Sequence, residues 1–243
     1  MNLLNIFIFL KENFKSSENN QEIDWLESIF DKKVAITIPS RIEYVNKFFK
    51  SFQLIPRIFN AILIKDIKDY KNDYGLKPGE IACALSQEKV LREFIENGEE
   101  RHLLLLEDDN KMFNSSLYTE SGLTLENIQQ YLYRAFKNLP SDWDVFYLGR
   151  CWDDCKNNIK VNEYIVKTKR TLCHHAIAFS RKGAKEVLKS IKHPLRLPID
   201  HIVANLSKSG YINSYACSIP IFYQNREELY TTLGNTDSLP ICL

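Results

Sequence analysis

Three consecutive acidic residues, Glu107, Asp108 and Asp109, directly follow a run of four leucines. The leucines predict a short buried strand, so the acids fall at its carboxyl end, where open α/β sheets place their ligand sites. Adjacent carboxylates repel each other at neutral pH, and a divalent cation shared with substrate phosphates would relieve that repulsion. The pattern indicates a metal site for a phosphorylated substrate. The alternative is a solvated acidic turn that ends a core strand.

The chain contains none of several common catalytic or nucleotide-binding motifs. It has no G-x-G-x-x-G fingerprint, no P-loop, no G-x-S-x-G elbow and no H-E-x-x-H pair. A strand-terminal acidic cluster remains. In a nucleotide-sugar transferase it would hold the metal on a diphosphate, and in a nucleotidyltransferase it would hold the metal on a triphosphate. Spacing alone does not separate these two classes.

Length, composition and net charge limit the fold and the classes of binding partner. With 243 residues, 44% of them hydrophobic, the chain is long enough for one large domain. Its 32 basic and 31 acidic residues leave a net charge of +1, so no global field indicates nucleic acid or an anionic membrane. The six cysteines form no CxxC pair, and we expect reduced thiols. A zinc set drawn from Cys151, Cys155, His174 and His175 matches no ribbon or finger spacing.

The N-terminal ten residues are apolar, but they lack a basic n-region and are too short to span a membrane. We expect residues 1–30 to form an N-terminal extension packed on a single domain, residues 31–243. No later segment is long and apolar enough to cross a bilayer, so we expect a protein without a transmembrane segment, located in the cytoplasm.

Hydrophobic periodicity predicts strands that alternate with helices, which favours an α/β fold with a mostly parallel sheet. Ser40 and Ser180 stand where helix caps are expected. The predicted strands are 33–38, 58–64, 102–106, 144–149, 164–166, 176–179 and 214–219. The predicted helices are 41–52, 78–97, 124–137, 181–191 and 199–207.

Five segments also occur in a characteristic order. They are the strand end 36–41, the helix start 78–86, the acidic strand end 104–109, the strand 144–149 and the turn 198–200. Together they resemble glycosyltransferase family twenty-five, which includes bacterial lipooligosaccharide galactosyltransferases and collagen galactosyltransferases. The resemblance runs from about Val34 to about Gln224. It implies a GT-A fold with a Rossmann-like central sheet flanked by helices, a UDP-sugar donor, Mn²⁺ or Mg²⁺, and inversion at the anomeric carbon.

The resemblance also implies roles for residues. Glu107 and Asp109 would face the metal and the diphosphate, with Asp108 between them on the donor side. Arg41 would meet the nucleotide, and Ser86 would line the same pocket. The alternative for Arg41 is a solvated residue in a first helical turn.

On the acceptor side, the resemblance makes Asp200 the base that takes the proton from the acceptor hydroxyl. Its alternative role is to complement a helix dipole. His174 and His175 precede an apolar strand; at least one is expected to be packed in the core, and His175 is a further candidate for the metal shell. Trp152 is the best candidate to stack on an acceptor sugar.

Three positions depart from the family pattern: Ala82 stands where the family usually has glycine, Gln87 where it has histidine, and Ile38-Pro39 where its first strand usually ends in an Asn-Leu pair. The expected function is a metal-dependent inverting transfer of galactose or glucose from a UDP-sugar to a hydroxyl of a glycan or glycosylated protein acceptor. Two alternatives are an inactive UDP-sugar-binding module of the same fold and a metal-dependent nucleotidyltransferase.

Overall fold

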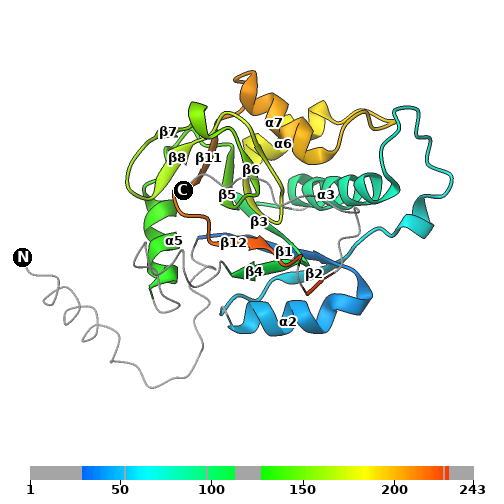
Figure 1. The fold of residues 1–243 in the computed structure, drawn as a ribbon, viewed down its shortest axis with the longest axis horizontal. Coiled ribbons are helices and arrows are strands. Elements are labelled where there is room, and N and C mark those ends of the chain that lie inside the picture. The colour runs from blue at the N-terminus through cyan, green and yellow to red at the C-terminus, as the bar shows by residue number, and fades with distance from the viewer. Residues whose placement is uncertain (1–28, 52, 97, 113–126, 227, 230–243) are drawn as a thin grey trace, which may run out of the picture.

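A central β-sheet with helices on both faces forms the body of the molecule (Figure 1). The computed structural model describes residues 29–229 apart from 52, 97, 113–126 and 227. The expected N-terminal extension, residues 1–30, therefore lies almost wholly outside the described residues. Within them, no helix combines the length and the apolar character needed to cross a membrane.

The sheet is mixed. β1 (Lys32–Thr37) pairs in parallel with β2 (Arg57–Asn60) and with β3 (His102–Glu107). The next strand, β10 (Ala176–Ser180), runs antiparallel to both β3 and β5 (Val145–Gly149). The strand order is β2-β1-β3-β10-β5-β11-β8-β7, where the last three are Ser214–Cys217, Ile165–Lys167 and Ile159–Lys160.

The prediction of an α/β fold with a mostly parallel sheet is confirmed, and the main departure within it is β10, which runs antiparallel to both of its neighbours. β10 begins beside the carboxyl end of β3, where Glu107 N donates to His175 O at 2.8 Å. A strand that enters the sheet from that edge must run antiparallel to β3. The antiparallel direction of β10 depends on where residues 173–175 lie. The hydrophobic periodicity of a strand gives no information about that position.

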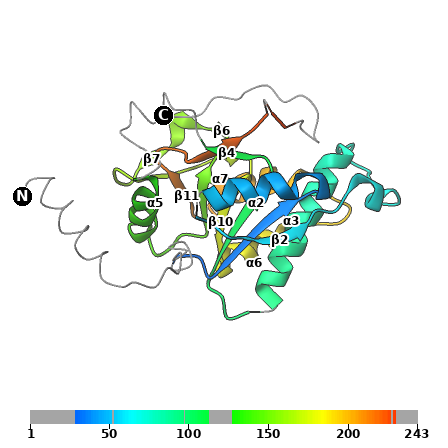
Figure 2. The same ribbon diagram turned by 90° about the horizontal axis from the view of Figure 1, so that it is seen from below.

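Alternation along the strands separates two cores. Leu103 and Leu105 face α3 (Pro78–Glu96), α6 (Arg181–Ser190) and α7 (Ile199–Lys208), whereas Leu104 and Leu106 face α2 (Ile42–Ser51) and α5 (Ile128–Lys137). Figure 1 shows α3 above the strands and α2 below them, and in Figure 2, seen from below, α2 lies in front of the strands. The alternation therefore sends Glu107, the next residue in the Leu103–Leu105 series, toward α3.

Several local predictions need correction. Ser180 caps α6, accepting from Gly183 N at 3.0 Å, but Ser40 lies inside a 3-10 turn, Pro39–Arg41, which precedes α2. β2 ends at Asn60, and residues Ile64–Ile67 form a second 3-10 turn rather than strand. Asp66 stabilises that turn, because its carboxylate accepts from Leu63 N at 2.9 Å.

Five short strands escaped prediction, one of which is β7 (Ile159–Lys160), paired with β8. Asn110–Met112 (β4) pairs with Phe222–Gln224 (β12), and Trp152–Asp153 (β6) pairs with Thr171–Leu172 (β9). The short 3-10 turn Cys155–Asn157 follows β6. These segments have two or three residues each, too few for a periodic pattern.

The β6–β9 ribbon explains a further correction. Trp152 lies opposite Leu172 in antiparallel register, which places their neighbours Cys151 and Cys173 face to face, and these two form a disulfide. The expectation of reduced thiols is wrong for this pair. It holds for Cys83 and Cys217, which are free.

Candidate active site

A cavity of about 420 Å³ lies at the carboxyl ends of β1 and β3. This volume falls within the range of small-molecule sites, roughly 300–1,000 Å³. Five of the residues predicted from sequence line it: Arg41, Ser86, Glu107, Asp108 and Asp109. The rest of the lining is largely apolar and includes the end of β1 and the segment after β2. It includes Ile36, Ile38, Ala61, Ile62, Leu63 and Ile64.

Glu107 ends β3 with its side chain against α3. Its Oε1 accepts from Gln87 Nε2 at 2.9 Å and from Cys83 Sγ at 3.5 Å. Cys83 and Gln87 are one helical turn apart and therefore share a face of α3. Burial, followed by the charge of Asp109, raises the pKa of Glu107 to about 8. Without a cation, this carboxyl group holds its proton at neutral pH.

Asp109 is another carboxylate of the cavity lining. Its Oδ2 accepts from Gln224 Nε2 at 3.1 Å, while its Oδ1 is buried without a hydrogen-bond partner among the described residues. Burial and the charge of Asp108 raise the pKa of Asp109 to about 6. A buried carboxylate oxygen without a donor is costly unless a ligand satisfies it.

Asp108, the middle acid, is committed to the fold. Its Oδ2 accepts from Ile38 N at 2.9 Å and from Thr37 Oγ1 at 3.2 Å, and its Oδ1 accepts from Arg41 at 2.7 Å. Arg41 is thus no solvated helix residue; its side chain is 12% exposed. The pair fastens the end of β3 to the end of β1 at the edge of the cavity.

Ser86 has a structural role in the cavity wall. Its hydroxyl donates to Ala82 O at 2.7 Å and accepts from Ile62 N at 2.8 Å. The second bond holds the segment after β2 against α3. Ser86 therefore shapes the wall that faces the acids.

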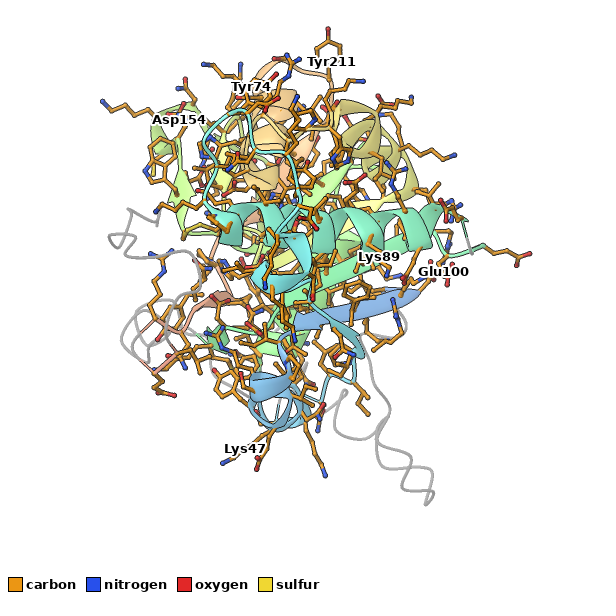
Figure 3. The ribbon with its side chains drawn as sticks, turned by 90° about the vertical axis from the view of Figure 1, so that its right-hand side faces the viewer. Lys47, Tyr74, Lys89, Glu100, Asp154 and Tyr211 are labelled. Atoms are coloured by element: carbon orange, nitrogen blue, oxygen red, sulfur yellow. A yellow bond between two sulfur atoms is a disulfide. The ribbon has the colours of Figure 1, made fainter. Side chains whose placement is uncertain are left out.

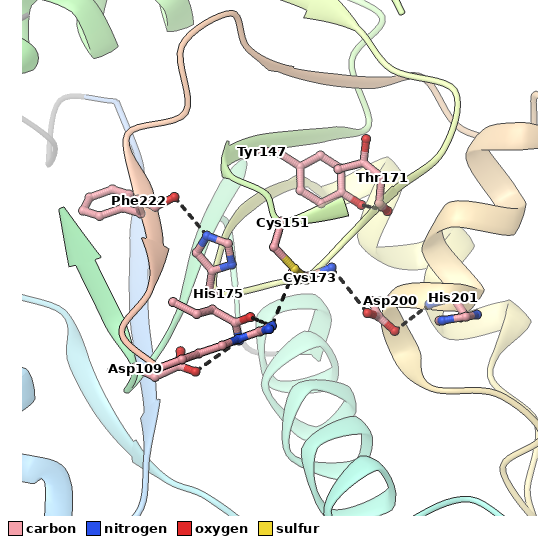
Figure 4. Close-up of a disulfide and its surroundings, with 11 residues drawn as sticks. Asp109, Tyr147, Cys151, Thr171, Cys173, His175, Asp200, His201 and Phe222 are labelled. Carbon is pink, nitrogen blue, oxygen red and sulfur yellow. Dashed lines mark hydrogen bonds between the residues drawn. A yellow bond between two sulfur atoms is a disulfide. The ribbon is translucent and has the colours of Figure 1, made fainter. Parts of the chain in front are cut away.

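Asp200 does not line the cavity. It lies in the first turn of α7, where its Oδ1 accepts from His201 N at 2.8 Å and its Oδ2 from Cys173 N at 3.3 Å. Figure 4 shows the Cys151–Cys173 disulfide between Asp109 and Asp200 in that view. Asp200 still interacts electrostatically with the cavity, because its negative charge contributes to the raised pKa of Glu107.

The two histidines have separate positions. His174 Nδ1 lies 2.9 Å from Gln87 Oε1, and His175 Nε2 lies 3.0 Å from the carbonyl oxygen of Phe222. Burial lowers the pKa of each to about 4, so both are neutral. His175 is held in the core by β12 and does not join the acids. In the described part of the chain, no three His, Cys, Asp or Glu side chains converge as a complete metal shell.

Aromatic residues lie both inside and outside the body. Trp143 and Tyr147 are buried in the core. The guanidinium of Arg170 lies 4.7 Å from the ring centroid of Trp152 and occupies one face of that ring. Tyr74 and Tyr211 are exposed and lie at the same end of the molecule (Figure 3).

Sequence reasoning missed three polar contributors to this region: Gln224, Arg226 and the contact of His174 with Gln87. Gln224 and Arg226 follow no pattern, because they belong to a three-residue strand and the turn after it. The position of Gln87 carried a signal, because its spacing from Cys83 places both on the helix face that packs under the acidic strand.

No family model matches the chain, and no curated protein matches it. Solved structures with distant similarity do exist. A197 from STIV is 12% identical over 76% of this chain and 81% of its own (TM-score 0.38). A putative glucose-1-phosphate thymidylyltransferase from Bacillus anthracis is 11% identical over 79% and 69% (TM-score 0.39). A UDP-glucose pyrophosphorylase complexed with UDP-glucose is 10% identical over 79% and 91% (TM-score 0.41). At these values the similarity assigns no family.

Proposed function

We propose that this protein is a metal-dependent glycosyltransferase that moves a hexose from a UDP-sugar to a hydroxyl of a glycan or glycosylated protein. One observation carries the proposal. The cavity holds the carboxyl groups of Glu107 and Asp109, each held by a glutamine amide, and the buried Asp109 Oδ1 has no hydrogen-bond partner among the described residues; the ion pair of Asp108 and Arg41 lies beside them.

The donor set fits a hard divalent cation such as Mn²⁺ or Mg²⁺. Glu107 and Asp109 supply oxygen ligands, and the buried, partnerless Asp109 Oδ1 lacks the positive partner that such an ion provides. Two carboxylates leave the other coordination positions to water and to a substrate diphosphate. When bound, the cation neutralises charge that develops on the diphosphate leaving group.

The chain's own residues would divide the remaining work. The apolar wall around Ile62 and Leu63 would exclude water from one side of the donor. Arg41, held at the cavity edge by Asp108, would orient the nucleotide. Asp200 would accept the proton from the acceptor hydroxyl as the bond from the anomeric carbon to the diphosphate oxygen breaks and the bond to the acceptor oxygen forms.

A panel of UDP-sugars tests this proposal, with thermal stability measured in the presence and absence of Mn²⁺ and release of UDP measured afterwards. We expect at least one UDP-sugar to raise the melting temperature only with Mn²⁺ present. EDTA should abolish the release of UDP, and Asp109→Asn should remove turnover while the protein stays folded. Full turnover in EDTA would exclude the metal role.

The same experiment separates the two alternatives. An inactive binding module would be stabilised by a UDP-sugar without releasing UDP. A nucleotidyltransferase would consume a nucleoside triphosphate and release pyrophosphate, which a coupled pyrophosphatase assay detects.

The variant Asp200→Asn tests the proposed base. Binding of UDP should remain while transfer to the acceptor is lost. An unchanged kcat would assign Asp200 to the helix terminus alone.

A further inference from the structure

Each of the two cavity carboxylates is held by the side-chain amide of a glutamine. Gln87, from α3, donates through Nε2 to Glu107 Oε1 at 2.9 Å. Gln224, from β12, donates through Nε2 to Asp109 Oδ2 at 3.1 Å. The two glutamines come from elements on different sides of the acidic strand end, yet they make the same contact. In each carboxylate one oxygen is fixed and the other remains for a ligand.

Each amide is in turn oriented by a donor on its own oxygen. Arg226 Nη2 donates to Gln224 Oε1 at 2.7 Å, and a guanidinium has no acceptor, so Gln224 must turn its NH₂ toward Asp109. His174 Nδ1 lies 2.9 Å from Gln87 Oε1. Because that oxygen only accepts, the neutral imidazole carries its proton on Nδ1. Two series of hydrogen bonds therefore end on the carboxylates. One begins at Arg226 and the other at His174.

We propose that Gln87 and Gln224 are positioning residues that set the cation affinity of the Glu107–Asp109 pair. This inference rests on the proposed metal site and adds residues that neither the acidic motif nor the resemblance assigns. A neutral amide suits the task. It satisfies one oxygen of a carboxylate and fixes its rotamer, but it leaves the negative charge that attracts the cation.

The alternatives for these positions would act differently. A lysine or arginine in direct contact would neutralise the carboxylate and compete with the cation, whereas an apolar side chain would leave a second buried oxygen unsatisfied. Hydrogen-bond partners behind metal ligands typically contribute about 10-fold to 100-fold in metal affinity. We expect losses of that size when either amide is removed.

Binding of Mn²⁺ to the purified, full-length protein provides a direct test. The free ion is followed by electron paramagnetic resonance in titrations with and without UDP. Gln87→Met and Gln224→Met preserve side-chain length and remove the amide. Gln129→Met is the matched control, because its amide also donates a hydrogen bond, to Gln53 at 2.9 Å, but on α5 and outside the cavity lining. Circular dichroism establishes whether each variant folds.

We expect the dissociation constant for Mn²⁺ to rise by about 10-fold or more in Gln87→Met and in Gln224→Met, and to stay unchanged in Gln129→Met. If the wild-type protein binds Mn²⁺ and both variants bind it equally well, the positioning role is overturned while the metal site stands. If the wild-type protein binds no Mn²⁺ even with UDP, the proposed metal site itself fails. Should the more buried Gln87→Met variant not fold, Gln224→Met alone decides between these outcomes.

Discussion

The guanidinium of Arg41 lies 2.7 Å from the carboxylate of Asp108, and this pair joins the end of β1 to the end of β3. Two further donors from β1, Thr37 Oγ1 and Ile38 N, fill the other oxygen of Asp108. The middle member of the acidic motif is therefore satisfied by the protein alone. Its neighbours, Glu107 and Asp109, point elsewhere, and the buried Asp109 Oδ1 has no hydrogen-bond partner among the described residues. Three adjacent acids thus have two different tasks.

This division predicts opposite effects of substitution on stability. Asp108→Ala removes three hydrogen bonds and leaves Arg41 without this carboxylate, so we expect a loss of about 2–4 kcal/mol, or very roughly 5–15 °C in melting temperature. Asp109→Asn removes a charge from a carboxylate with a buried, unsatisfied oxygen and should leave the melting temperature equal or higher. Thermal unfolding followed by circular dichroism compares the two. Equal losses would mean that the acids are structurally equivalent.

The raised pKa of Glu107, about 8, makes the stability of the cation-free protein depend on pH. The unfolded chain has the ordinary value of 4.5, so between these values the folded state binds more protons than the unfolded state. Stability from this group is full below about pH 4.5 and is lost as the pH rises toward about 8. Asp109, with a pKa of about 6, acts in the same direction.

Glu107→Gln carries no titrating group, so we expect it to lose less stability than the wild-type protein between about pH 6 and pH 8 in EDTA. A difference of at least about 1 kcal/mol corresponds to about 2–4 °C in melting temperature for a chain of this size. Glu93→Gln, which alters a surface pair with Arg57, is the matched control and should follow the wild-type protein. Identical pH profiles for Glu107→Gln and Glu93→Gln would contradict the assignment.

The central strands and helices of this fold follow from the sequence, because each buries a face long enough to leave a periodic pattern. β3 is the clearest case: four leucines predict the strand, and their alternation predicts that Glu107 faces the same side as Leu103 and Leu105. The resemblance placed Arg41, Ser86 and the three acids in one pocket, and all five line the cavity.

What could not be predicted depends on contacts between residues far apart in the chain. Gln224 reaches Asp109 through β12, which pairs with β4, and three residues carry no periodic signal. The antiparallel direction of β10 depends on the contact of its start with the end of β3, and the disulfide of Cys151 with Cys173 follows from the β6–β9 pairing. Asp200 was expected beside the cavity, but its motif fixes only its place at the start of α7.

Gly149 allows close packing behind the site. A methyl group at this position would overlap the ring of His175 and the carbonyl oxygen of Phe222. His175 directly precedes β10, and Phe222 belongs to β12. Both elements are packed, so these two neighbours cannot easily move apart. We expect Gly149→Ala to destabilise the protein by about 1–3 kcal/mol. Urea unfolding measures the loss of stability. Gly210→Ala is unsuitable as a control because the φ of Gly210 is +75°. Ser190→Ala, at the end of α6, serves as the control instead. A Gly149→Ala variant as stable as Ser190→Ala would contradict this account of the packing.

The Cys151–Cys173 disulfide should connect stability to the proposed base. It closes a segment with a sequence separation of 22, and Cys173 N donates to Asp200 at 3.3 Å. The double variant Cys151→Ser/Cys173→Ser relaxes that segment. We expect it to lose about 2–4 kcal/mol of unfolding free energy.

Because Asp200 also loses its anchored donor, transfer to the acceptor should fall more than binding of UDP. The value of kcat should therefore drop, while the dissociation constant for UDP stays within about twofold, a difference of roughly 0.4 kcal/mol. Cys217→Ser, a buried free thiol away from Asp200, is the control for the loss of a sulfur atom. If the double variant loses stability and UDP binding together but retains kcat, then the disulfide supports the donor cavity and Asp200 does not depend on it.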